Sequence, residues 1–317
     1  MVVSVELAKS AILENMYDIC TIGHITLDKV VTTQSVKFMP GGTSFYFSKA
    51  IQDFDINYTL VTALGSDEAY IVDGLRESNI DVRALDSDFT VHFENIYSQN
   101  QDHREQNVLH TAATFDVPQM PDLEAKIYHL GPLLSDDITV DLIKFLASKG
   151  EVSLDIQGFL RFVKDKKVYY RDWADKTEAL PYITYLKANE FEMEAVTGTS
   201  NVEAGAKYLA DLGVREVIIT LGSRGSVIYT DGKFHQVPAY HPESIVDATG
   251  CGDTYMAGYL LQRTKGGSIR RSGEFGAAMA TLKIASSGPF SGTLEQIETI
   301  ITQGAHTPQI AGNAAVE

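Results

Sequence analysis

One short stretch constrains this chain more than any other: Asp247–Asp253, with the sequence DATGCGD, followed at once by small and apolar residues at helical spacing. A glycine-rich turn that opens a helix presents free backbone N–H groups at the positive end of the helix dipole, and such a turn binds phosphate-like anions. Asp253 falls in the first helical turn, where a carboxylate can take a proton from a hydroxyl that attacks a phosphoryl group. Ordinary turn glycines and an N-cap aspartate would give the same pattern, so the rest of the chain has to decide.

Length and charge limit the classes of protein that this chain can belong to. Its 317 residues suffice for one large α/β domain or two ordinary ones. The net charge of −16 argues against nucleic acid or an anionic membrane as a partner. The two cysteines, Cys20 and Cys251, make no disulfide framework. The sequence shows neither a signal-peptide pattern nor a long apolar run, so we expect a cytoplasmic protein without a membrane segment.

The order of the elements predicts an α/β fold. Apolar strands alternate with helical stretches, which is typical of a parallel sheet. We expect strands at 18–23, 58–64, 127–130, 152–156, 185–188 and 217–221, and helices at 1–16, 45–54, 136–148, 204–212, 253–264 and 275–286. Segments at about 29–38 and 79–115 alternate like antiparallel strands and predict a small β lid with a polar tip at 98–106. A further strand is expected to reach Ile245-Val246, just before the DATGCGD stretch.

Further candidate binding residues follow the ends of the expected strands. Asp28 lies just past the first strand, where α/β proteins place ligand-binding side chains. The glycine pair Gly41-Gly42 precedes a helix, and the hydroxyl of Thr43 beside it suits a polyol. The first strand lacks the spaced glycines of a dinucleotide-binding turn, which argues against a nicotinamide enzyme.

Four motifs together resemble the PfkB (ribokinase-like) family of carbohydrate kinases over nearly the whole chain. DATGCGD matches the family signature D-x-T-G-A-G-D, and the other three motifs agree with the family in order and spacing. These are Gly41-Gly42, Asn189-x-x-Glu192 and Thr220-Leu221-Gly222-x-x-Gly225. The resemblance implies one kinase domain over residues 1–317, with a three-layer α/β/α fold, a mostly parallel central sheet and a small β lid.

The same resemblance implies a role for each motif. Asp253 would be the catalytic base, and the backbone N–H groups of Gly250, Cys251 and Gly252 would form an anion hole. Asn189 and Glu192 would organise water-bound Mg²⁺ and the nucleotide phosphates. The ATP site would be lined by Thr220, Gly222 and Gly225. The acceptor's hydroxyl groups would be held by Asp28, Gly41, Gly42 and Thr43. Asp247 and Thr249 correspond to positions that some members use for a monovalent cation such as K⁺.

Two departures and one finer resemblance bear on the acceptor. Tyr46 stands where many sugar kinases of the family have an asparagine after the glycine pair, which makes ribose a doubtful acceptor. Cys251 replaces the usual alanine of the anion-hole turn, where a small side chain still fits. The segment Leu154–Arg161 resembles the plant-type myo-inositol kinase branch, which implies a cyclitol acceptor bound by Asp155 and Arg161.

We therefore expect an ATP-dependent kinase that phosphorylates a hydroxyl of a sugar or cyclitol. A nucleoside kinase is the alternative within the same class, because aromatic residues near the lid could stack on a base. A non-catalytic sugar or nucleotide sensor is the alternative of another class, although the intact Asp253, Asn189 and Glu192 argue against it. The lid strands could also pair between the subunits of a homodimer.

Overall fold

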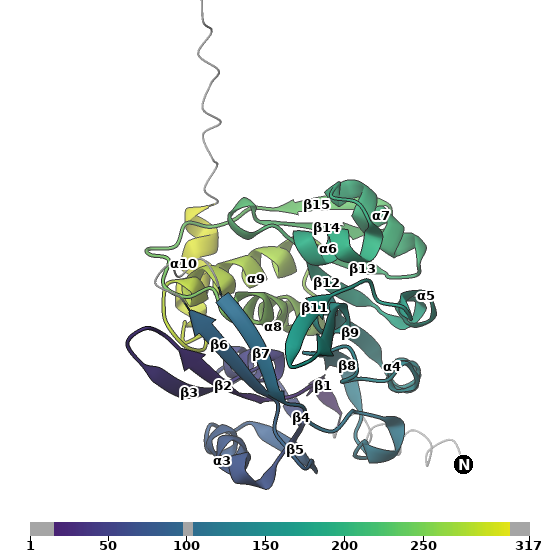
Figure 1. Ribbon diagram of the computed structural model, residues 1–317. Helices are drawn as coiled ribbons and strands as arrows, with labels where there is room; N and C mark the ends of the chain where they lie inside the picture. Colours follow the sequence, from purple (N-terminus) through teal and green to yellow (C-terminus); the bar gives the residue numbers. More distant parts are fainter. Residues whose placement is uncertain (1–15, 98–103, 305–317) are drawn as a thin grey trace, which may run out of the picture.

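Two β-sheets organise the part of the chain that the computed structural model describes, residues 16–97 and 104–304. The larger sheet has nine strands and the smaller has six, and helices lie along the larger one (Figure 1). The helix expected at 1–16 and most of the polar tip lie outside the described residues. The assignment of the whole chain to one domain therefore stays a prediction.

The large sheet is mostly parallel, as expected. Its strand order is β15-β14-β13-β12-β9-β8-β1-β4-β5, and only the pairs β13/β14 and β14/β15 are antiparallel. Every residue of β4 is buried, which is typical of a strand covered on both faces. The strands are β1 (Tyr17–Ile22), β4 (Tyr58–Leu64), β5 (Asp81–Asp86), β8 (Ala125–Leu130), β9 (Glu151–Asp155), β12 (Tyr185–Asn189), β13 (Glu216–Thr220), β14 (Ser226–Thr230) and β15 (Lys233–Val237).

Helices cover both faces of this sheet and complete the three layers. On one face lie α2 (Thr43–Ile51), α3 (Ala69–Glu77), α8 (Cys251–Thr264), α9 (Ile269–Ile284) and α10 (Leu294–Gln303). On the other lie α4 (Val140–Ala147), α5 (Lys176–Ala179), α6 (Glu190–Thr197) and α7 (Val202–Asp211). Successive side chains of β1 point to opposite faces of the sheet. Ile19 therefore packs in one apolar core and Cys20 in the other. None of the helices within the described ranges has the length and apolar character to cross a membrane.

The small sheet is the lid, and its membership corrects the sequence prediction. Its order is β10-β11-β7-β6-β2-β3. The strands are β2 (Thr26–Val31), β3 (Val36–Gly41), β6 (His92–Tyr97), β7 (Arg104–His110), β10 (Arg161–Lys164) and β11 (Lys167–Tyr170). The predicted lid segment 79–115 was too long, because Asp81–Asp86 pairs in parallel with β4 at the edge of the large sheet. Only Val82 of this edge strand is buried, so its sequence has few core residues and resembles that of a lid strand.

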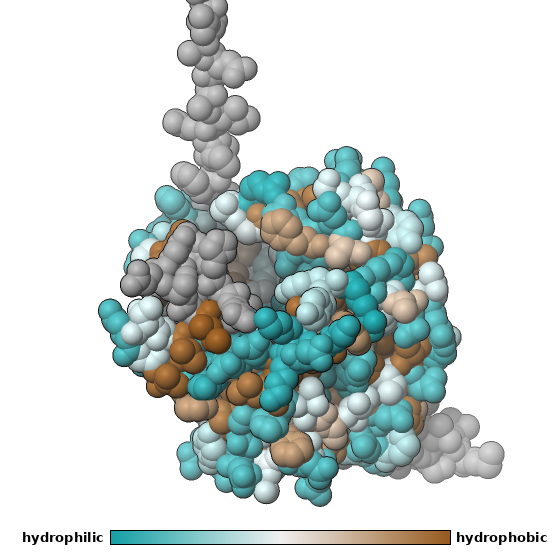
Figure 2. Space-filling model, in the orientation of Figure 1, coloured by the Kyte–Doolittle hydropathy of each residue, from teal (hydrophilic) through white to brown (hydrophobic). Residues whose placement is uncertain are grey.

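The outer edge of the lid carries apolar side chains. Val36 and Phe38 on β3 are 56% and 60% exposed, and Figure 2 shows brown, hydrophobic atoms gathered at this end of the molecule. Pairing of lid strands between two subunits stays a prediction.

The segment before α8 is a loop, so the strand expected at Ile245-Val246 is wrong. Ile245 is 78% exposed. The N–H groups of Val246 and Asp247 both donate to the carbonyl of Ile284, at 2.8 and 3.2 Å. A β-branched pair favours a strand locally, but here the backbone finds its partner at the end of a helix, which no local pattern reveals.

Helices α8 and α9 pack closely against each other. A Cβ atom added at Gly276 would lie 2.6 Å from the carbonyl oxygen of Tyr255, and one added at Gly258 would lie 3.0 Å from Cα of Gly276. Glycine at this crossing lets the two backbones approach. Since α8 begins at the DATGCGD stretch, this contact also helps to position that stretch.

Replacing Gly276 with alanine should lower the free energy of unfolding by about 1–3 kcal/mol, because the new methyl group meets backbone that cannot move aside. Gly74 in α3 is the matched control, since a Cβ atom there meets nothing within 4 Å. Gly74→Ala should instead stabilise the protein by about 0.5–1 kcal/mol. Urea unfolding of both variants measures the two effects. Equal and small changes would show that the α8–α9 crossing has room to relax.

Candidate active site

A pocket of about 570 Å³ lies where the two sheets meet. It collects residues from the carboxyl ends of β9, β12 and β13, from the lid, and from the start of α8, as expected for a ligand site of a parallel sheet. Of the residues predicted from the sequence, the pocket is lined by Asp28, Gly42, Thr43, Asp155, Arg161, Asn189, Glu192, Thr220, Gly222, Thr249, Gly250, Gly252 and Asp253. The pocket lining does not include four other predicted residues: Gly41, Gly225, Asp247 and Cys251.

Asp253 lies in the first turn of α8 and has an unusual pKa. Removal from water and the nearby charge of Asp155 raise the pKa of its carboxyl group to about 7. Lys187 and a hydrogen bond with the Thr43 side chain oppose this rise but do not cancel it. A carboxyl group that titrates near neutral pH is suited to accept a proton and release it again.

Lys187 is the principal site residue that the sequence analysis missed. Its ammonium nitrogen lies 2.9 Å from Oδ2 of Asp155 and 3.7 Å from Oε2 of Glu192, and all three side chains are buried. A Cβ atom added at Gly252 would come within 3.1 Å of the same nitrogen, so Lys187 reaches the first turn of α8. Burial alone would lower the pKa of Lys187, but the two carboxylates outweigh it and raise that pKa above its usual value. A lysine inside an otherwise apolar strand was the available signal, because a buried charge needs a partner.

Asn189 and Glu192 form a capping box at the start of α6. Oδ1 of Asn189 accepts from the N–H groups of Phe191 and Glu192, at 2.9 and 2.8 Å, while Oε2 of Glu192 accepts from the N–H of Asn189 at 2.7 Å. This leaves the NH₂ group of Asn189 as its donor toward a ligand. Burial and the charge of Asp155 raise the pKa of Glu192, while Lys187 opposes them.

The donor set fits a magnesium ion held through water. Within residues 16–97 and 104–304, no three acidic, histidine or cysteine side chains are arranged to enclose a metal ion. The oxygen of Asn189 is occupied by the cap, so direct ligation by Asn189 does not fit. Mg²⁺ commonly keeps several waters beside substrate phosphates, and Asp155, Glu192 and Asp253 line the pocket where such waters would be.

The turn that opens α8 is an anion site made of backbone. Gly250 is the N-cap residue with a φ of 76°, and a Cβ atom there would lie 2.4 Å from the ring of Tyr46. The N–H of Cys251 donates to the carbonyl of Ala248 at 3.2 Å, and the N–H of Thr254 donates to Gly250 at 2.9 Å. The N–H groups of Gly252 and Asp253 precede the first helical hydrogen bond and are available to a ligand, whereas the N–H of Cys251, predicted to be part of the anion hole, is bonded to Ala248. Tyr46, the departure from the family pattern, packs under this turn and is 4% exposed.

The two predicted glycines that do not line the pocket, Gly41 and Gly225, leave room for neighbouring atoms. A Cβ atom at Gly41 would lie 2.8 Å from Oδ2 of Asp28, so this glycine makes room for that carboxylate. Gly225 has a φ of 88° and closes the turn between β13 and β14, where a Cβ atom would lie 2.1 Å from the carbonyl of Val237. Thr220 and Gly222, on the same turn, reach the pocket.

The lid end of the pocket is polar with an aromatic wall. Arg161 is 5% exposed, donates to Oε1 of Gln106, and lies 5.1 Å over the ring of Phe93. Gln157 donates to Glu192 at 3.4 Å and lines the pocket as well. No sequence motif indicated Phe93, Gln106 or Gln157 as site residues. The sequence pattern places Gln106 in the polar tip, but β7 brings this side chain back over the site.

The predicted monovalent-cation position already contains a positive charge from the chain itself. The ammonium group of Lys283 donates to the carbonyl of Asp247 at 3.0 Å and lies 3.6 Å from Oδ2 of the same residue. Oδ1 of Asp247 accepts from the N–H of Thr249 at 2.9 Å. A K⁺ ion beside Asp247 and Thr249 therefore does not fit this chain.

Comparison with known proteins decides the family. The family described as pfkB family carbohydrate kinase matches residues 10–296. This chain belongs to the pfkB family. The resemblance inferred from the motifs is confirmed, and the protein is a phosphotransferase of the carbohydrate and nucleoside kinase type.

Individual relatives are similar over the length of this kinase. The cytidine kinase of Thermococcus kodakarensis is 26% identical over 287 residues, covering 88% of this chain and all of the relative. A solved pyrophosphate-dependent kinase of the ribokinase family, complexed with a pyrophosphate analog and myo-inositol, is 27% identical with a TM-score of 0.78. It covers 89% of this chain and 100% of that structure. The ribokinase of Arabidopsis thaliana with ribose and ATP, at 20% identity and a TM-score of 0.74, shares the fold.

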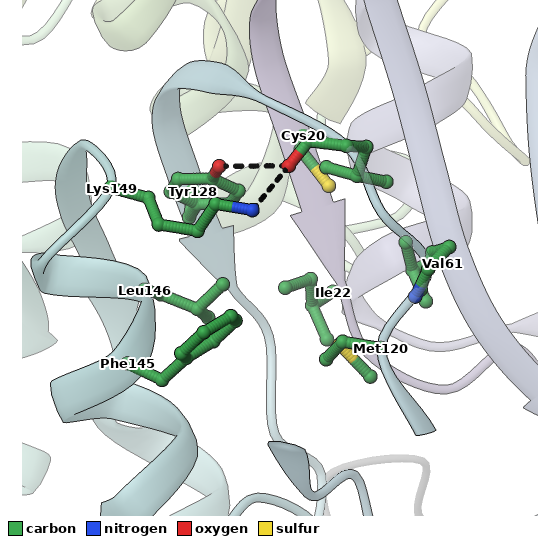
Figure 3. Close-up of a pocket in the computed structure, with 10 residues that line it drawn as sticks. Cys20, Ile22, Val61, Met120, Tyr128, Phe145, Leu146 and Lys149 are labelled. Carbon is green, nitrogen blue, oxygen red and sulfur yellow. Dashed lines mark hydrogen bonds between the residues drawn. The ribbon is translucent and has the colours of Figure 1, made fainter. Parts of the chain in front are cut away.

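The two cysteines of this kinase differ in their surroundings. Cys251 is half-buried in the α8 turn, where burial first, and then Asp247 and Asp253, raise the pKa of its thiol to about 11, while Lys283 opposes this rise. At neutral pH we therefore expect Cys251 to be present mainly as the thiol. Cys20 is buried in β1 beside a small apolar cavity of about 10 Å³ (Figure 3), and burial raises the pKa of its thiol further.

Alkylation by iodoacetamide at pH 7.5 should therefore be slow at Cys251, because little of its thiol is ionised. The rate should rise roughly tenfold per pH unit up to about pH 10, and ATP with Mg²⁺ should slow it further. Peptide mass mapping follows both sites, and Cys20 is the internal control that stays unmodified. Fast modification of Cys251 at neutral pH would show a thiolate stabilised by the helix N-terminus.

Proposed function

We propose that this kinase transfers the γ-phosphoryl group of ATP to a hydroxyl of a polyol, either a cyclitol or a sugar. One observation carries the proposal: a carboxyl group with a pKa of about 7, Asp253, stands between a polar pocket and the free N–H groups that open α8. A base and an anion site held side by side are what phosphoryl transfer requires of a protein.

In the proposed step, the acceptor hydroxyl gives its proton to the Asp253 carboxylate as its oxygen forms a bond to the γ-phosphorus. The bond from that phosphorus to the bridging oxygen breaks, and ADP leaves with the electron pair. The N–H groups of Gly252 and Asp253, with the ammonium of Lys187 beneath them, are positioned to stabilise the charge that spreads over the phosphoryl oxygens.

Magnesium would enter with the nucleotide and neutralise part of the phosphate charge. Glu192 and Asp155 would hold its waters, consistent with their place in the pocket lining. The NH₂ group of Asn189 would donate to a phosphate oxygen. Thr220 and Gly222 would line the donor end, with Gly225 shaping their turn.

The acceptor end favours a ligand with several hydroxyls. The pocket lining includes Asp28, Thr43, Asp155, Gln106, Gln157 and Arg161. Carboxylates accept hydrogen bonds from hydroxyl groups, a guanidinium donates to them, and amides do both. Gly42 would let the backbone approach the acceptor. Because a similar solved structure is complexed with myo-inositol, a cyclitol is the first acceptor to test.

A nucleoside is the second candidate, and a specific feature favours it. Phe93 and Tyr170 both line the pocket, and an aromatic ring can stack on a base. The relative from Thermococcus kodakarensis is a cytidine kinase that matches along its full length.

A panel of acceptors and donors tests the proposed function. ATP and pyrophosphate are each offered with myo-inositol and other cyclitols, pentoses, hexoses and nucleosides, and the phosphorylated products are measured by mass spectrometry. We expect a cyclitol or sugar product with ATP. Preference for cytidine or another nucleoside would establish the second candidate, and transfer from pyrophosphate alone would overturn the ATP assignment.

Asp253→Asn should lower kcat by about 10²–10⁴, the range for loss of a general base, with little change in the KM for ATP. In the wild type, kcat/KM should rise with pH and level off above about pH 7, because only the ionised carboxylate accepts the proton and its pKa is about 7. Steady-state kinetics across pH measures both. A flat profile, or a variant that keeps more than about a tenth of the rate, would remove Asp253 from the base role.

A further inference from the structure

We propose that the buried ammonium group of Lys283 is a built-in monovalent cation, which frees this kinase from any requirement for K⁺. The inference deepens the proposed function, on which it rests. Lys283 is a positioning residue in this proposal: it touches neither substrate nor nucleotide, and acts through the turn that opens α8.

The surroundings of Lys283 are those of a bound cation. Its side chain extends from the last turn of α9 and is fully buried. The ammonium group donates to the carbonyls of Asp247 and Ser286, at 3.0 and 3.3 Å, and lies 3.6 Å from Oδ2 of Asp247. A carboxylate and backbone carbonyls are also the oxygen ligands that a hard metal cation takes in proteins.

A buried lysine without such partners would be strongly unfavourable, so these contacts are not incidental. The ammonium group donates hydrogen bonds to two backbone carbonyls and forms an ion pair with one carboxylate. The charge is attached to the chain, whereas a free ion would have to be recruited from solution.

The position of this charge links it to catalysis. Asp247 begins the stretch that ends in the Gly250 N-cap of α8, and its Oδ1 atom accepts from the N–H of Thr249. Lys283 therefore connects the loop before α8 to the turn after α9. The N–H groups of Val246 and Asp247 reinforce the connection by donating to Ile284. Loss of the charge would loosen the loop that holds the phosphate-binding turn in place.

The experiment compares rates in K⁺, Na⁺ and choline chloride at constant ionic strength, with choline salts of ATP. We expect the kcat of the wild-type enzyme to be equal in the three salts. Lys283→Ala removes the charge and opens space, so its kcat should fall about 10- to 100-fold in choline and recover in K⁺ or ammonium. Lys283→Met fills the space without a charge, so its lower kcat should not recover.

Lys149→Ala is the matched control. Lys149 also bonds a carbonyl and a carboxylate, Leu123 at 3.0 Å and Glu124 at 2.9 Å, but it lies beside the apolar cavity of Figure 3. The kcat of the Lys149→Ala variant should be the same in K⁺, Na⁺ and choline. As a readout independent of the acceptor, the thermal unfolding midpoint of Lys283→Ala should rise in K⁺ relative to choline, and that of the wild type should not.

Each result decides a separate question. A wild-type enzyme that needs K⁺ overturns the proposal and leaves the kinase function standing, even where Lys283→Ala does not fold. A folded Lys283→Ala that keeps its rate in choline, or that loses it without recovery in any cation, also overturns the proposal. If no acceptor on the panel is phosphorylated, the proposed function fails, and the unfolding midpoints still report whether a cation takes the place of the ammonium group.

Discussion

The ammonium group of Lys187 is the charge on which the active site depends. It lies between the buried carboxylates of Asp155 and Glu192 and reaches the turn that carries Asp253. Without it, three carboxyl groups would share a poorly hydrated pocket and repel one another as well as a phosphate. With it, the pKa of Asp253 rises only to about 7, so the group can both accept and release a proton near neutrality.

A second buried lysine contacts the loop that leads into the same turn. Lys283, in the last turn of α9, donates a hydrogen bond to the carbonyl of Asp247 in that loop, while the ammonium group of Lys187 lies next to Gly252. The chain as a whole carries a charge of −16. The two lysines and the N-terminus of α8 place positive charge at fixed positions around the candidate site.

The architecture explains why residues far apart in the sequence meet here. Parallel strands end at one edge of a sheet, so Asp155, Asn189 and Thr220 lie near one another although each is the last residue of a different strand. The lid then closes over this edge with β7 and the β10–β11 hairpin, which bring Gln106 and Arg161 together. The polar groups that line the pocket therefore come from the lid as well as from the large sheet.

The sequence by itself determined the family, the three-layer fold and most of the pocket lining, because glycine spacing and strand periodicity are local properties. It predicted Asp253, Asn189 and Glu192 from their motifs. It could not separate the edge strand Asp81–Asp86 from the lid, because both alternate in the same way. Nor could it predict the role of Lys187 or Lys283, since the meaning of a buried charge depends on partners that lie 32 and 36 residues away along the chain. Only the tertiary structure decided those contacts, because they arise when separate strands and helices pack against one another.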